Sequence, residues 1–332
     1  MTYRAALVGC GLIGSEFSDT SSMTGIWSHA AAYTSCPDTQ LVAVCDPDQG
    51  KLERCAKRWK VAARFKDLAT MLDRQGPEIV SICTPDATHY PLIRQALEHP
   101  DVRAVLAEKP LAANLAQAGE LASLAARLGK VLAVNYSRRY ATGFGELKAI
   151  IERGELGKIQ AVSGFFTKGT VHNGSHWFDL AHFLIGPVRR VLGIDRLREQ
   201  DDDPTLDVIL EFESGAAGYL HGCDATAYDL FEMDIVASAG RARIVEEGFE
   251  IQLYQVEPSP FGAGYKRLAR RGEIDPGLPN ALSEAVADIV RCLGEQGIPR
   301  CSAGDALQAL AIGLAARRSA KDGQAVLLKD FR

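Results

Sequence analysis

The sequence predicts an α/β protein in which an N-terminal doubly wound parallel sheet precedes a C-terminal α+β part with a largely antiparallel sheet. Short apolar runs alternate with amphipathic stretches over the first 135 residues, a pattern typical of βαβ units. After about residue 140, apolar and polar residues alternate instead, and a glycine motif follows the first apolar run. We therefore expect domains at residues 1–137 and 138–332, with the C-terminal helices able to pack back on the first domain.

Five clear apolar runs and one shorter run predict the six strands of the first sheet: Arg4–Val8, Leu41–Cys45, Ile79–Cys83, Val102–Ala107, Val131–Val134 and the shorter Val61–Phe65. Their Val- and Ile-rich character favours strands that are buried on both faces. Between them, Leu111–Leu128 repeats apolar residues every three or four positions, which predicts an amphipathic helix. Right-handed crossovers between such units produce the doubly wound arrangement.

The second half predicts antiparallel hairpins. Leu206–Phe212 alternates apolar and polar residues, Ser214-Gly215 makes a turn, and Ala217–His221 returns. The series continues with Phe231–Val236, Ala242–Val245 and Phe249–Leu253, which indicates a sheet with one face solvated or covered by a partner. We expect Glu257–Arg271 to be a long loop, and helical periodicity to resume at Leu282–Leu293 and Leu307–Leu314.

Composition excludes several classes of protein. Of 332 residues, 47% are apolar and 24% are charged, which is enough apolar surface to exclude global disorder. A net charge of −5 without a basic block argues against a nucleic-acid or membrane partner. No apolar run reaches about 18 residues, and the N-terminus lacks the features of a signal peptide. Eight cysteines without CxxC spacing indicate no metal site, and are typical of reduced thiols in a cytoplasmic protein.

A dinucleotide signature follows the first predicted strand. Gly9-Cys10-Gly11-Leu12-Ile13-Gly14 fits GxGxxG, in which the glycines permit a tight turn, approach of a pyrophosphate and close packing. The start of the next helix would present N–H groups to the anion. Asp46 ends the second strand and favours NAD over NADP, although it could instead cap a helix. Asp46 lies 32 positions after Gly14, against about 20 expected, so we read the polar segment 15–24 as an insertion near the cofactor.

Four further motifs lie at residues 83–89, 108–110, 135–140 and 172–179: CTPDATH, EKP, NYSRRY and HNGSHWFD. In this order and spacing the chain resembles the Gfo/Idh/MocA family, the relatives of glucose–fructose oxidoreductase and inositol dehydrogenase, over nearly its whole length. The resemblance implies an NAD(P)-binding Rossmann domain and hydride transfer at one carbon of a sugar, inositol or sugar nucleotide. It also implies a homodimer or homotetramer formed through the C-terminal sheet.

Oxidation of a secondary alcohol requires a base at the hydroxyl and a cation that stabilises the developing alkoxide. Lys109 and His176 supply these group types. By resemblance, Lys109 matches the family's catalytic lysine, His176 matches its general acid/base, and Pro110 follows a cis bond. The alternatives are a surface lysine and a core or capping histidine.

One position departs from the family pattern. Inositol-dehydrogenase-like members carry an aspartate four residues before the catalytic histidine, where this chain has His172. Asp179 could partly substitute, because residues three apart share a helix face, or it could only complement the helix dipole. The segment His172–His176 is similar to members of surface-polysaccharide and nonulosonic-acid pathways, which implies an amino-sugar or sugar-nucleotide substrate.

The remaining candidate residues are expected to contact the two predicted ligands, the cofactor and the substrate. On the cofactor side they are Leu12, Ile13, Thr84, Pro85, His89 and Glu108, and on the substrate side Asn135, Tyr136, Arg138 and Asn173. His89 could only cap the next helix, and Arg138 with Arg139 could pin the domain junction. For Trp27 and His29 a core role is favoured.

Two other functions remain open at this point. One is an NAD-retaining hydrolase or lyase of the same family, in which transient oxidation acidifies a neighbouring C–H and the cofactor is regenerated. The other is a non-catalytic sensor that binds a nucleotide and a partner protein. Lys109 and His176 argue against the sensor, whereas His172 keeps it open.

Overall fold

The computed structural model describes residues 2–17, 24–199 and 202–331, and the chain divides into two compact units. The first contains Met1–Tyr140 and Pro279–Leu307, and the second contains Ala141–Leu278 and Gln308–Arg332. The expected boundary at residue 137 lies just inside the first unit, which also takes in a segment from the C-terminal part. Within the described ranges, no helix is both long and apolar enough to cross a bilayer.

The first unit is built on a six-stranded sheet of order β3-β2-β1-β4-β5-β6, in which every pair is parallel. Its strands are β1 (Tyr3–Val8), β2 (Thr39–Cys45), β3 (Ala63–Phe65), β4 (Ile79–Ile82), β5 (Ala104–Ala107) and β6 (Val131–Val134). All six predicted strands are therefore confirmed. The central strands β4 and β5 are buried along their whole length, as their unbroken apolar sequences require.

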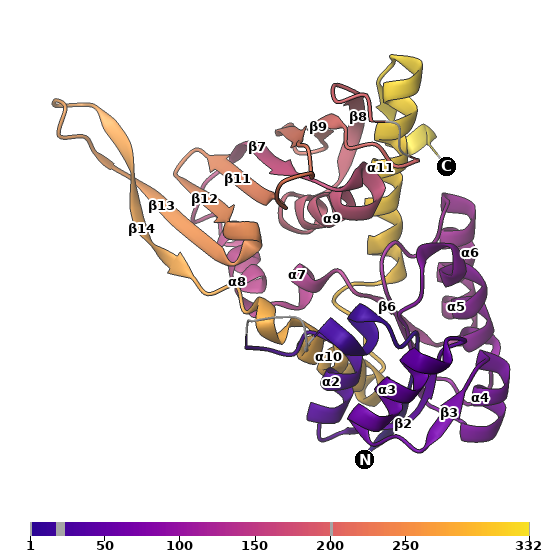
Figure 1. Cartoon of the computed structure of the whole chain (residues 1–332). Coiled ribbons are helices and arrows are strands. Elements are labelled where there is room, and N and C mark those ends of the chain that lie inside the picture. Colours follow the sequence, from indigo (N-terminus) through magenta and orange to yellow (C-terminus); the bar gives the residue numbers. More distant parts are fainter. Residues whose placement is uncertain (1, 18–23, 200–201, 332) are drawn as a thin grey trace. The chain divides into compact units, whose positions relative to one another are not determined.

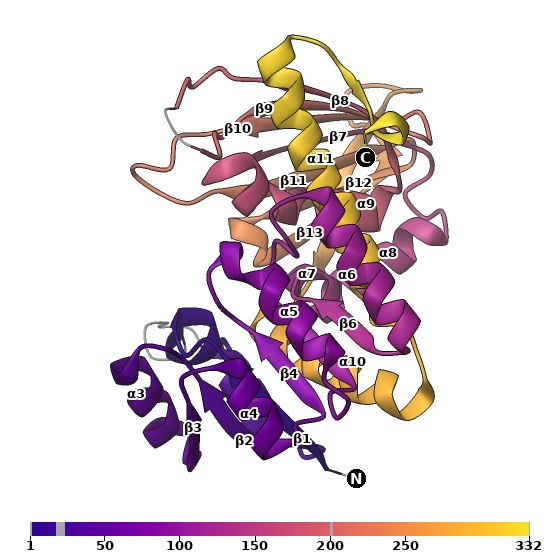
Figure 2. The same cartoon turned by 90° about the vertical axis from the view of Figure 1, so that its right-hand side faces the viewer.

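Helices cover both faces of this sheet. One face carries α2 (His29–Ser35), α3 (Gln49–Trp59) and α10 (Ala281–Glu295), and the other α4 (Leu68–Gln75), α5 (His89–Glu98) and α6 (Leu115–Leu128), as Figure 2 shows for the second group. Helix α6 begins at Leu115 and not at the expected Leu111, because Asn114 caps it by accepting a hydrogen bond from the Gln117 N–H.

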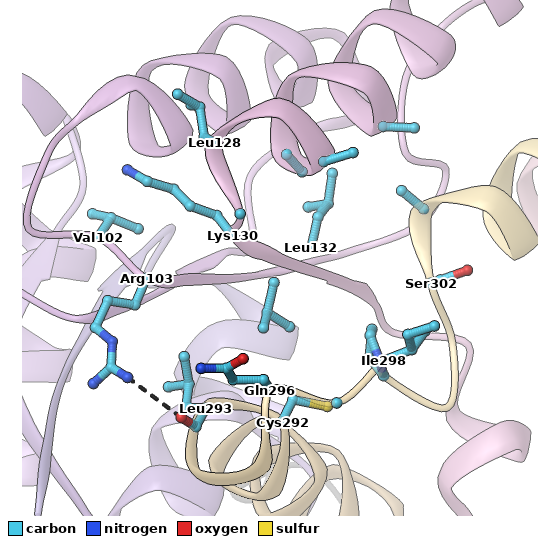
Figure 3. Close-up of a pocket in the computed structure, with 18 of the residues that line it drawn as sticks. Val102, Arg103, Leu128, Lys130, Leu132, Cys292, Leu293, Gln296, Ile298 and Ser302 are labelled. Atoms are coloured by element: carbon cyan, nitrogen blue, oxygen red, sulfur yellow. Dashed lines mark hydrogen bonds between the residues drawn. The ribbon is translucent and has the colours of Figure 1, made fainter.

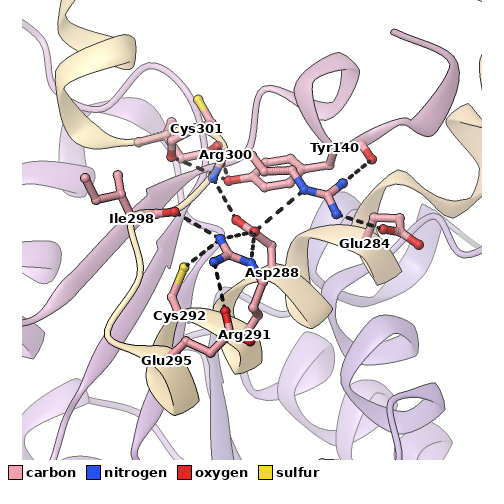
Figure 4. A network of polar contacts seen from close by, with 10 residues as sticks. Tyr140, Glu284, Asp288, Arg291, Cys292, Glu295, Ile298, Arg300 and Cys301 are labelled. Carbon is pink, nitrogen blue, oxygen red and sulfur yellow. Dashed lines mark hydrogen bonds and ion pairs between the residues drawn. The ribbon is translucent and has the colours of Figure 1, made fainter. Parts of the chain in front are cut away.

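A buried carboxylate anchors the segment that follows α10 to that helix (Figure 4). The Asp288 side chain is fully buried, and it accepts hydrogen bonds from the Arg291 guanidinium at 2.7 Å and from the Arg300 N–H at 2.8 Å. Arg300 in turn donates to the Tyr140 carbonyl at 3.3 Å. The segment then pairs with the edge strand β6 through a bridge between Ser302 and Ala133. These contacts explain why Pro279–Leu307 belongs to the first unit.

The second unit contains a nine-stranded sheet of order β14-β13-β12-β11-β7-β10-β9-β8-β15. Its strands are β7 (Ile159–Phe166), β8 (Val188–Ile194), β9 (Asp207–Phe212), β10 (Ala217–Gly222), β11 (Phe231–Ala237), β12 (Gly240–Val245), β13 (Glu250–Pro258), β14 (Lys266–Ile274) and β15 (Val326–Leu327). Among the strands of this sheet that the structure describes, β7 and β10 are parallel and the other neighbouring pairs are antiparallel, so the largely antiparallel sheet is confirmed. Strands β7, β8, β14 and β15 are additions to the predicted set.

The expectation of a long loop at Glu257–Arg271 is wrong at both ends, because only residues 259–265 of this range lie outside strands. Strand β13 continues to Pro258, and β14 returns antiparallel to it, so that the two form a long hairpin (Figure 1). Glu257 faces Arg267 across the hairpin and accepts its hydrogen bonds at 2.7 and 2.9 Å. Most side chains of β14 are exposed, so the strand lacks the alternation that reveals a half-buried strand.

Helices α8 (Thr142–Glu152), α9 (Gly174–Ile185) and the later part of α11 (Ala303–Asp322) belong to the second unit. Strand β8 approaches α11 so closely that a Cβ at Gly193 would lie 2.1 Å from the Ala316 carbonyl oxygen. Side chains that point to the other face of the sheet, including Phe165, Ile194 and Tyr219, are about half exposed in this chain. The sheet therefore has one covered and one open face, as the alternation predicted.

Candidate active site

The predicted cofactor residues of the first unit gather where its parallel strands end. The chain runs outward from β1 in both directions, toward β2 on one side and β4 on the other. In doubly wound sheets this reversal opens a crevice at the carboxyl ends of the strands, where ligands bind. The glycine motif follows β1, Asp46 follows β2, Thr84 follows β4 and Glu108 follows β5, so the topology brings these segments to one edge.

A different steric feature explains why a glycine suits each of the three positions of the motif. Gly9 has φ +94°, and a Cβ there would lie 2.4 Å from the Cys83 carbonyl oxygen. A Cβ at Gly14 would lie 2.0 Å from the Gly9 carbonyl oxygen, so this glycine lets the turn close on itself. At Gly11 a Cβ would meet nothing within 4 Å, which leaves the backbone open to an incoming group. The loop therefore fits a pyrophosphate that approaches at Gly11.

The helix expected after this loop begins as a π-helix. Leu12 and Ile13 lie in the five-residue π-helix Leu12–Glu16, and Phe17 continues in helical conformation. The insertion expected at 15–24 includes residues 18–23, which lie outside the described residues. After them, α2 begins at His29 with Ser28 as its cap.

Asp46 fixes the glycine loop and is not a helix cap. Its carboxylate accepts hydrogen bonds from the Cys10 N–H at 2.8 Å and from the Asp48 N–H at 2.9 Å. The cap of α3 is Asp48, which accepts from the Lys51 N–H, and this bond lowers the pKa of Asp48. Asp46 thus lies beside the loop, where an acidic residue meets the hydroxyls of an adenine ribose.

His89 joins the segments that follow β4 and β5. It is fully buried, with Nδ1 2.7 Å from the Pro110 carbonyl oxygen and Nε2 2.8 Å from the Thr84 carbonyl oxygen. Carbonyl oxygens only accept, so a ring nitrogen that carries a hydrogen donates it to the carbonyl that it faces. Thr84 is half-buried and Pro85 is exposed, so these two can meet a ligand while His89 holds them in place.

The Glu-Lys-Pro turn combines a buried anion with a half-buried lysine. The bond between Lys109 and Pro110 is cis, as the family resemblance implied. Oε1 of Glu108 accepts from the Asn135 amide at 2.6 Å and lies 2.9 Å from Nε2 of His29. Burial by itself would raise the pKa of Glu108, but the hydrogen bonds from His29 and Asn135 and the charge of Lys109 hold that pKa below its ordinary value.

Asn135 and its neighbours lie at the end of β6. Oδ1 of Asn135 is buried and has no hydrogen-bond partner among the described residues, so it can accept from a ligand. Tyr136 is buried and Arg138 is half-buried. Arg139 forms an ion pair with Asp305 at 3.0 Å inside the first unit, and its side chain is 5% exposed. A structural role is therefore favoured for Arg139.

The histidine motif of the second unit begins in the π-helix Gly169–Asn173 and continues into α9. The Asp203 carboxylate holds its start, because it accepts from the N–H groups of Val171 and His172 at 2.7 to 3.0 Å. The side chain of His172 is exposed, and that of His176 is half-buried one turn later.

Two residues after His176 anchor the helix in the second unit. Asp179 is 1% exposed, and Trp177 is fully buried with its indole N–H donating to the Glu232 carbonyl at 3.0 Å. The Asn173 amide donates to the Thr167 carbonyl at 2.8 Å, so this side chain braces the turn. The motif therefore presents two partly exposed imidazoles on a firmly packed helix start.

A pocket of about 910 Å³ lies elsewhere in the first unit (Figure 3). Its walls come from α6, the starts of β5 and β6, and the segment after α10. None of the predicted site residues lines it, and Arg103 in its wall already donates to the Leu293 carbonyl at 3.3 Å. It lies at the amino ends of the strands, opposite the edge where doubly wound sheets bind ligands.

Sequence analysis missed how His29 participates in the site. Its burial was expected, but its bonds to Ser81 and Glu108 were not. A histidine placed next to small apolar residues is a weak signal, and the insertion also hides its spacing from the glycine motif. Within residues 2–17, 24–199 and 202–331, no three His, Cys, Asp or Glu side chains gather as a metal site would require.

A doubly wound parallel sheet with this glycine loop and an acid after the second strand defines a dinucleotide-binding protein of the Rossmann type. Comparison with protein families agrees. Residues 3–136 match the family described as "Oxidoreductase family, NAD-binding Rossmann fold", and residues 144–243 match the GFO/IDH/MocA C-terminal domain. The chain belongs to the Gfo/Idh/MocA oxidoreductase family, and its first unit is an NAD-binding domain.

Relatives carry names of sugar and inositol dehydrogenases. The D-glucoside 3-dehydrogenase of Escherichia coli K12 is 29% identical over 210 residues, which span 59% of this chain and only 55% of that protein. The myo-inositol 2-dehydrogenase of Thermotoga maritima is 23% identical over 98% of this chain and 99% of its own length. The WlbA dehydrogenase of Bordetella pertussis, solved with NADH and UDP-GlcNAcA, shares the fold with a TM-score of 0.80 at 21% identity, covering 98% of this chain and 97% of that one.

Proposed function

We propose that this oxidoreductase transfers a hydride between a nicotinamide and a secondary alcohol or ketone carbon of a sugar, an inositol or a sugar nucleotide. The observation that carries the proposal is Lys109, a half-buried lysine at the carboxyl end of β5 in a turn fixed on both sides. The names of the glucoside and inositol dehydrogenases among its relatives support the substrate class.

In this proposal, residues of the first unit bind the dinucleotide. Gly9, Gly11 and Gly14 shape the loop for a pyrophosphate, and Asp46 accepts from ribose hydroxyls, which favours NAD over NADP because a 2′-phosphate would meet a carboxylate. Bound NAD+ supplies the acceptor for the hydride. We assign the nicotinamide end to Thr84, Pro85 and Oδ1 of Asn135, which has no partner among the described residues.

The proton chemistry needs a cation and a base. We assign the cation to Lys109, whose ammonium lowers the energy of a developing alkoxide. We assign the base to His176, because a half-buried imidazole can take up and release a proton near neutral pH. Asp179 is buried on the same helix and supports its placement, whereas exposed His172 contacts substrate in this proposal.

Substrate selection falls to polar groups near the strand end and the histidine motif. Arg138 and Tyr136 offer a guanidinium and a phenol, and Asn173 and His172 offer an amide and an imidazole from the second unit. A guanidinium suits a carboxylate or phosphate, which fits the sugar-nucleotide class implied by the His172–His176 resemblance.

Absorbance at the NADH band during incubation with NAD+ and aldoses, inositols or UDP-sugars tests the proposal. K109M and H176A are expected to lower kcat by about 10²- to 10³-fold, while the Kd for NADH changes by only a few fold. Substrate conversion without net NADH would favour the NAD-retaining hydrolase or lyase. No conversion of any of these compounds, with NADH still bound, would favour the non-catalytic sensor.

We also propose a homodimer or homotetramer that buries the open face of the second unit's sheet. Phe165, Ile194 and Tyr219 are apolar and 43–45% exposed on strands of this sheet. Light scattering should report more than one chain per particle, and F165E should lower that number. The eight cysteines, all free, are consistent with a cytoplasmic location as part of the same proposal.

A further inference from the structure

A chain of buried hydrogen bonds runs from α2 to the Glu-Lys-Pro turn. The Tyr33 hydroxyl lies 2.8 Å from Oγ of Ser81, which lies 2.9 Å from Nδ1 of His29. Nε2 of the same imidazole lies 2.9 Å from Oε1 of Glu108. Tyr33, Ser81 and His29 are completely buried, so these groups satisfy one another without solvent.

The Glu108 carboxylate determines which nitrogen of His29 carries a hydrogen toward it. An ionised carboxylate only accepts, so Nε2 of His29 donates to Oε1 of Glu108. Nδ1 of the ring faces Oγ of Ser81, a hydroxyl that can either accept or donate, and Ser81 in turn meets the Tyr33 hydroxyl. The bond from Nε2 runs in the direction that favours an ionised carboxylate.

Two opposing effects act on the protonation of Glu108. Burial favours its neutral form, whereas donors from His29 and Asn135 converge on Oε1 and favour the anion. The titratable groups that face it are His29 from α2, Cys83 from the end of β4 and Lys109 beside it. Burial and the Glu108 charge both raise the pKa of the Cys83 thiol well above its ordinary value, so Cys83 stays uncharged. Lys109 is the lysine whose positive charge favours the ionised form of Glu108.

The two flanks of Lys109 are held by different means. His89 holds the backbone through the Pro110 carbonyl at 2.7 Å, whereas His29 acts on the Glu108 side chain. Loss of His29 would therefore leave the turn anchored through Pro110 but would remove one of two donors to the carboxylate. This separation makes the charge of Glu108 testable apart from the placement of the turn.

We propose that His29 is a positioning residue for the candidate catalytic lysine: its N–H keeps Glu108 an anion, and that anion holds the ammonium group of Lys109 in place. The proposal rests on the proposed function only for the consequence to catalysis. The hydrogen-bond chain and the charge on Glu108 belong to the protein whether or not it turns over a sugar.

Infrared titration of the full chain without dinucleotide measures the first step, with E108Q to assign the carboxyl band. H29L removes the donor, and the Glu108 titration is expected to move up by about one to two pH units. H29Q can accept from Ser81 through its oxygen and donate to Glu108 through its nitrogen, so it should restore most of the wild-type value. Y33F is the matched control, because it shortens the chain at its far end and should leave Glu108 unchanged.

The second step, the effect of Glu108 on Lys109, is measured on Lys109 itself. The pH dependence of its labelling by trinitrobenzenesulfonate, located by mass spectrometry, is expected to shift to lower pH in E108Q. It should stay unchanged in H29L, because Glu108 in that variant is still ionised in the alkaline range where a lysine titrates. If H29L does not fold, E108Q tests the same step, because it neutralises the side chain with little change in shape. An unchanged Glu108 titration in folded H29L, or unchanged Lys109 labelling in E108Q, overturns the proposal.

A kinetic comparison connects the inference to catalysis. With a substrate found by the NADH screen, we expect the midpoint of the acid limb of the kcat–pH profile to move to higher pH in H29L. The size of this move should equal the shift of the Glu108 titration seen in the infrared, while the KM for NAD+ stays constant. A failed screen would refute the proposed function and leave the infrared result standing. A shifted Glu108 with an unshifted kcat profile would refute the role of His29 in catalysis.

Discussion

Two glycines of the same motif should respond to alanine in opposite ways. At Gly14 the new Cβ would lie 2.0 Å from the Gly9 carbonyl oxygen and 3.5 Å from Cβ of Cys83, so the loop must move by about 1 Å or more to reach ordinary contact. Such overpacking costs about 1–3 kcal/mol of unfolding free energy. At Gly11 the Cβ meets nothing within 4 Å, and φ of −79° suits alanine, so stability should change by less than about 0.5 kcal/mol.

For ligand binding, the more sensitive of the two glycines should be Gly11. The Gly11 methyl would occupy the space through which a pyrophosphate approaches, so G11A is expected to raise the Kd for NADH at least tenfold, a loss of about 1.4 kcal/mol. At an NADH concentration of 100 wild-type Kd, the wild type gains about 2.7 kcal/mol, whereas G11A should gain only about 1.4 kcal/mol or less.

Thermal unfolding with and without NADH, together with titration of NADH fluorescence, measures both effects. At about 2–4 °C per kcal/mol for a domain of this size, G14A should lose roughly 2–12 °C in Tm without ligand. G11A should keep its Tm without ligand and lose most of the NADH-induced rise. Wild-type NADH affinity in G11A would show that the pyrophosphate does not pass this glycine, and an unchanged Tm in G14A would refute the packing argument.

Three other predictions follow from the same edge of the sheet. D46S should lower discrimination against NADP by removing the carboxylate, and a comparison of Kd values for NADH and NADPH measures it. H89L can donate to neither the Pro110 nor the Thr84 carbonyl, so urea unfolding should show a loss of about 1–3 kcal/mol, and no loss would mean that these bonds are dispensable. Because the pKa of Glu108 lies below its ordinary 4.5, its stabilisation is present above that pH and disappears as the pH falls through the lowered value. The Tm difference between wild type and E108Q should therefore be larger at pH 7 than near pH 3.

Local sequence patterns determined the elements of the first sheet and the chemistry of its edge. Buried parallel strands are read from continuous apolar runs, because both of their faces meet helices, and all six were predicted in this way. The glycine motif and Asp46 were also readable, because a strand followed by GxGxxG has few other structural uses. The same patterns missed the hairpin of β13 and β14, since a strand with exposed faces need not alternate.

Only the tertiary structure decided which polar side chains act together. His29 and Glu108 are 79 positions apart, and nothing in either segment indicates that the imidazole donates to the carboxylate. His89 and Pro110 likewise meet only because β4 and β5 are neighbours in the sheet. A hydrogen bond depends on distances of a few tenths of an ångström between groups that the chain brings together from afar. Residue spacing along the chain specifies helices, strands and turns, whereas packing of the whole unit specifies these contacts.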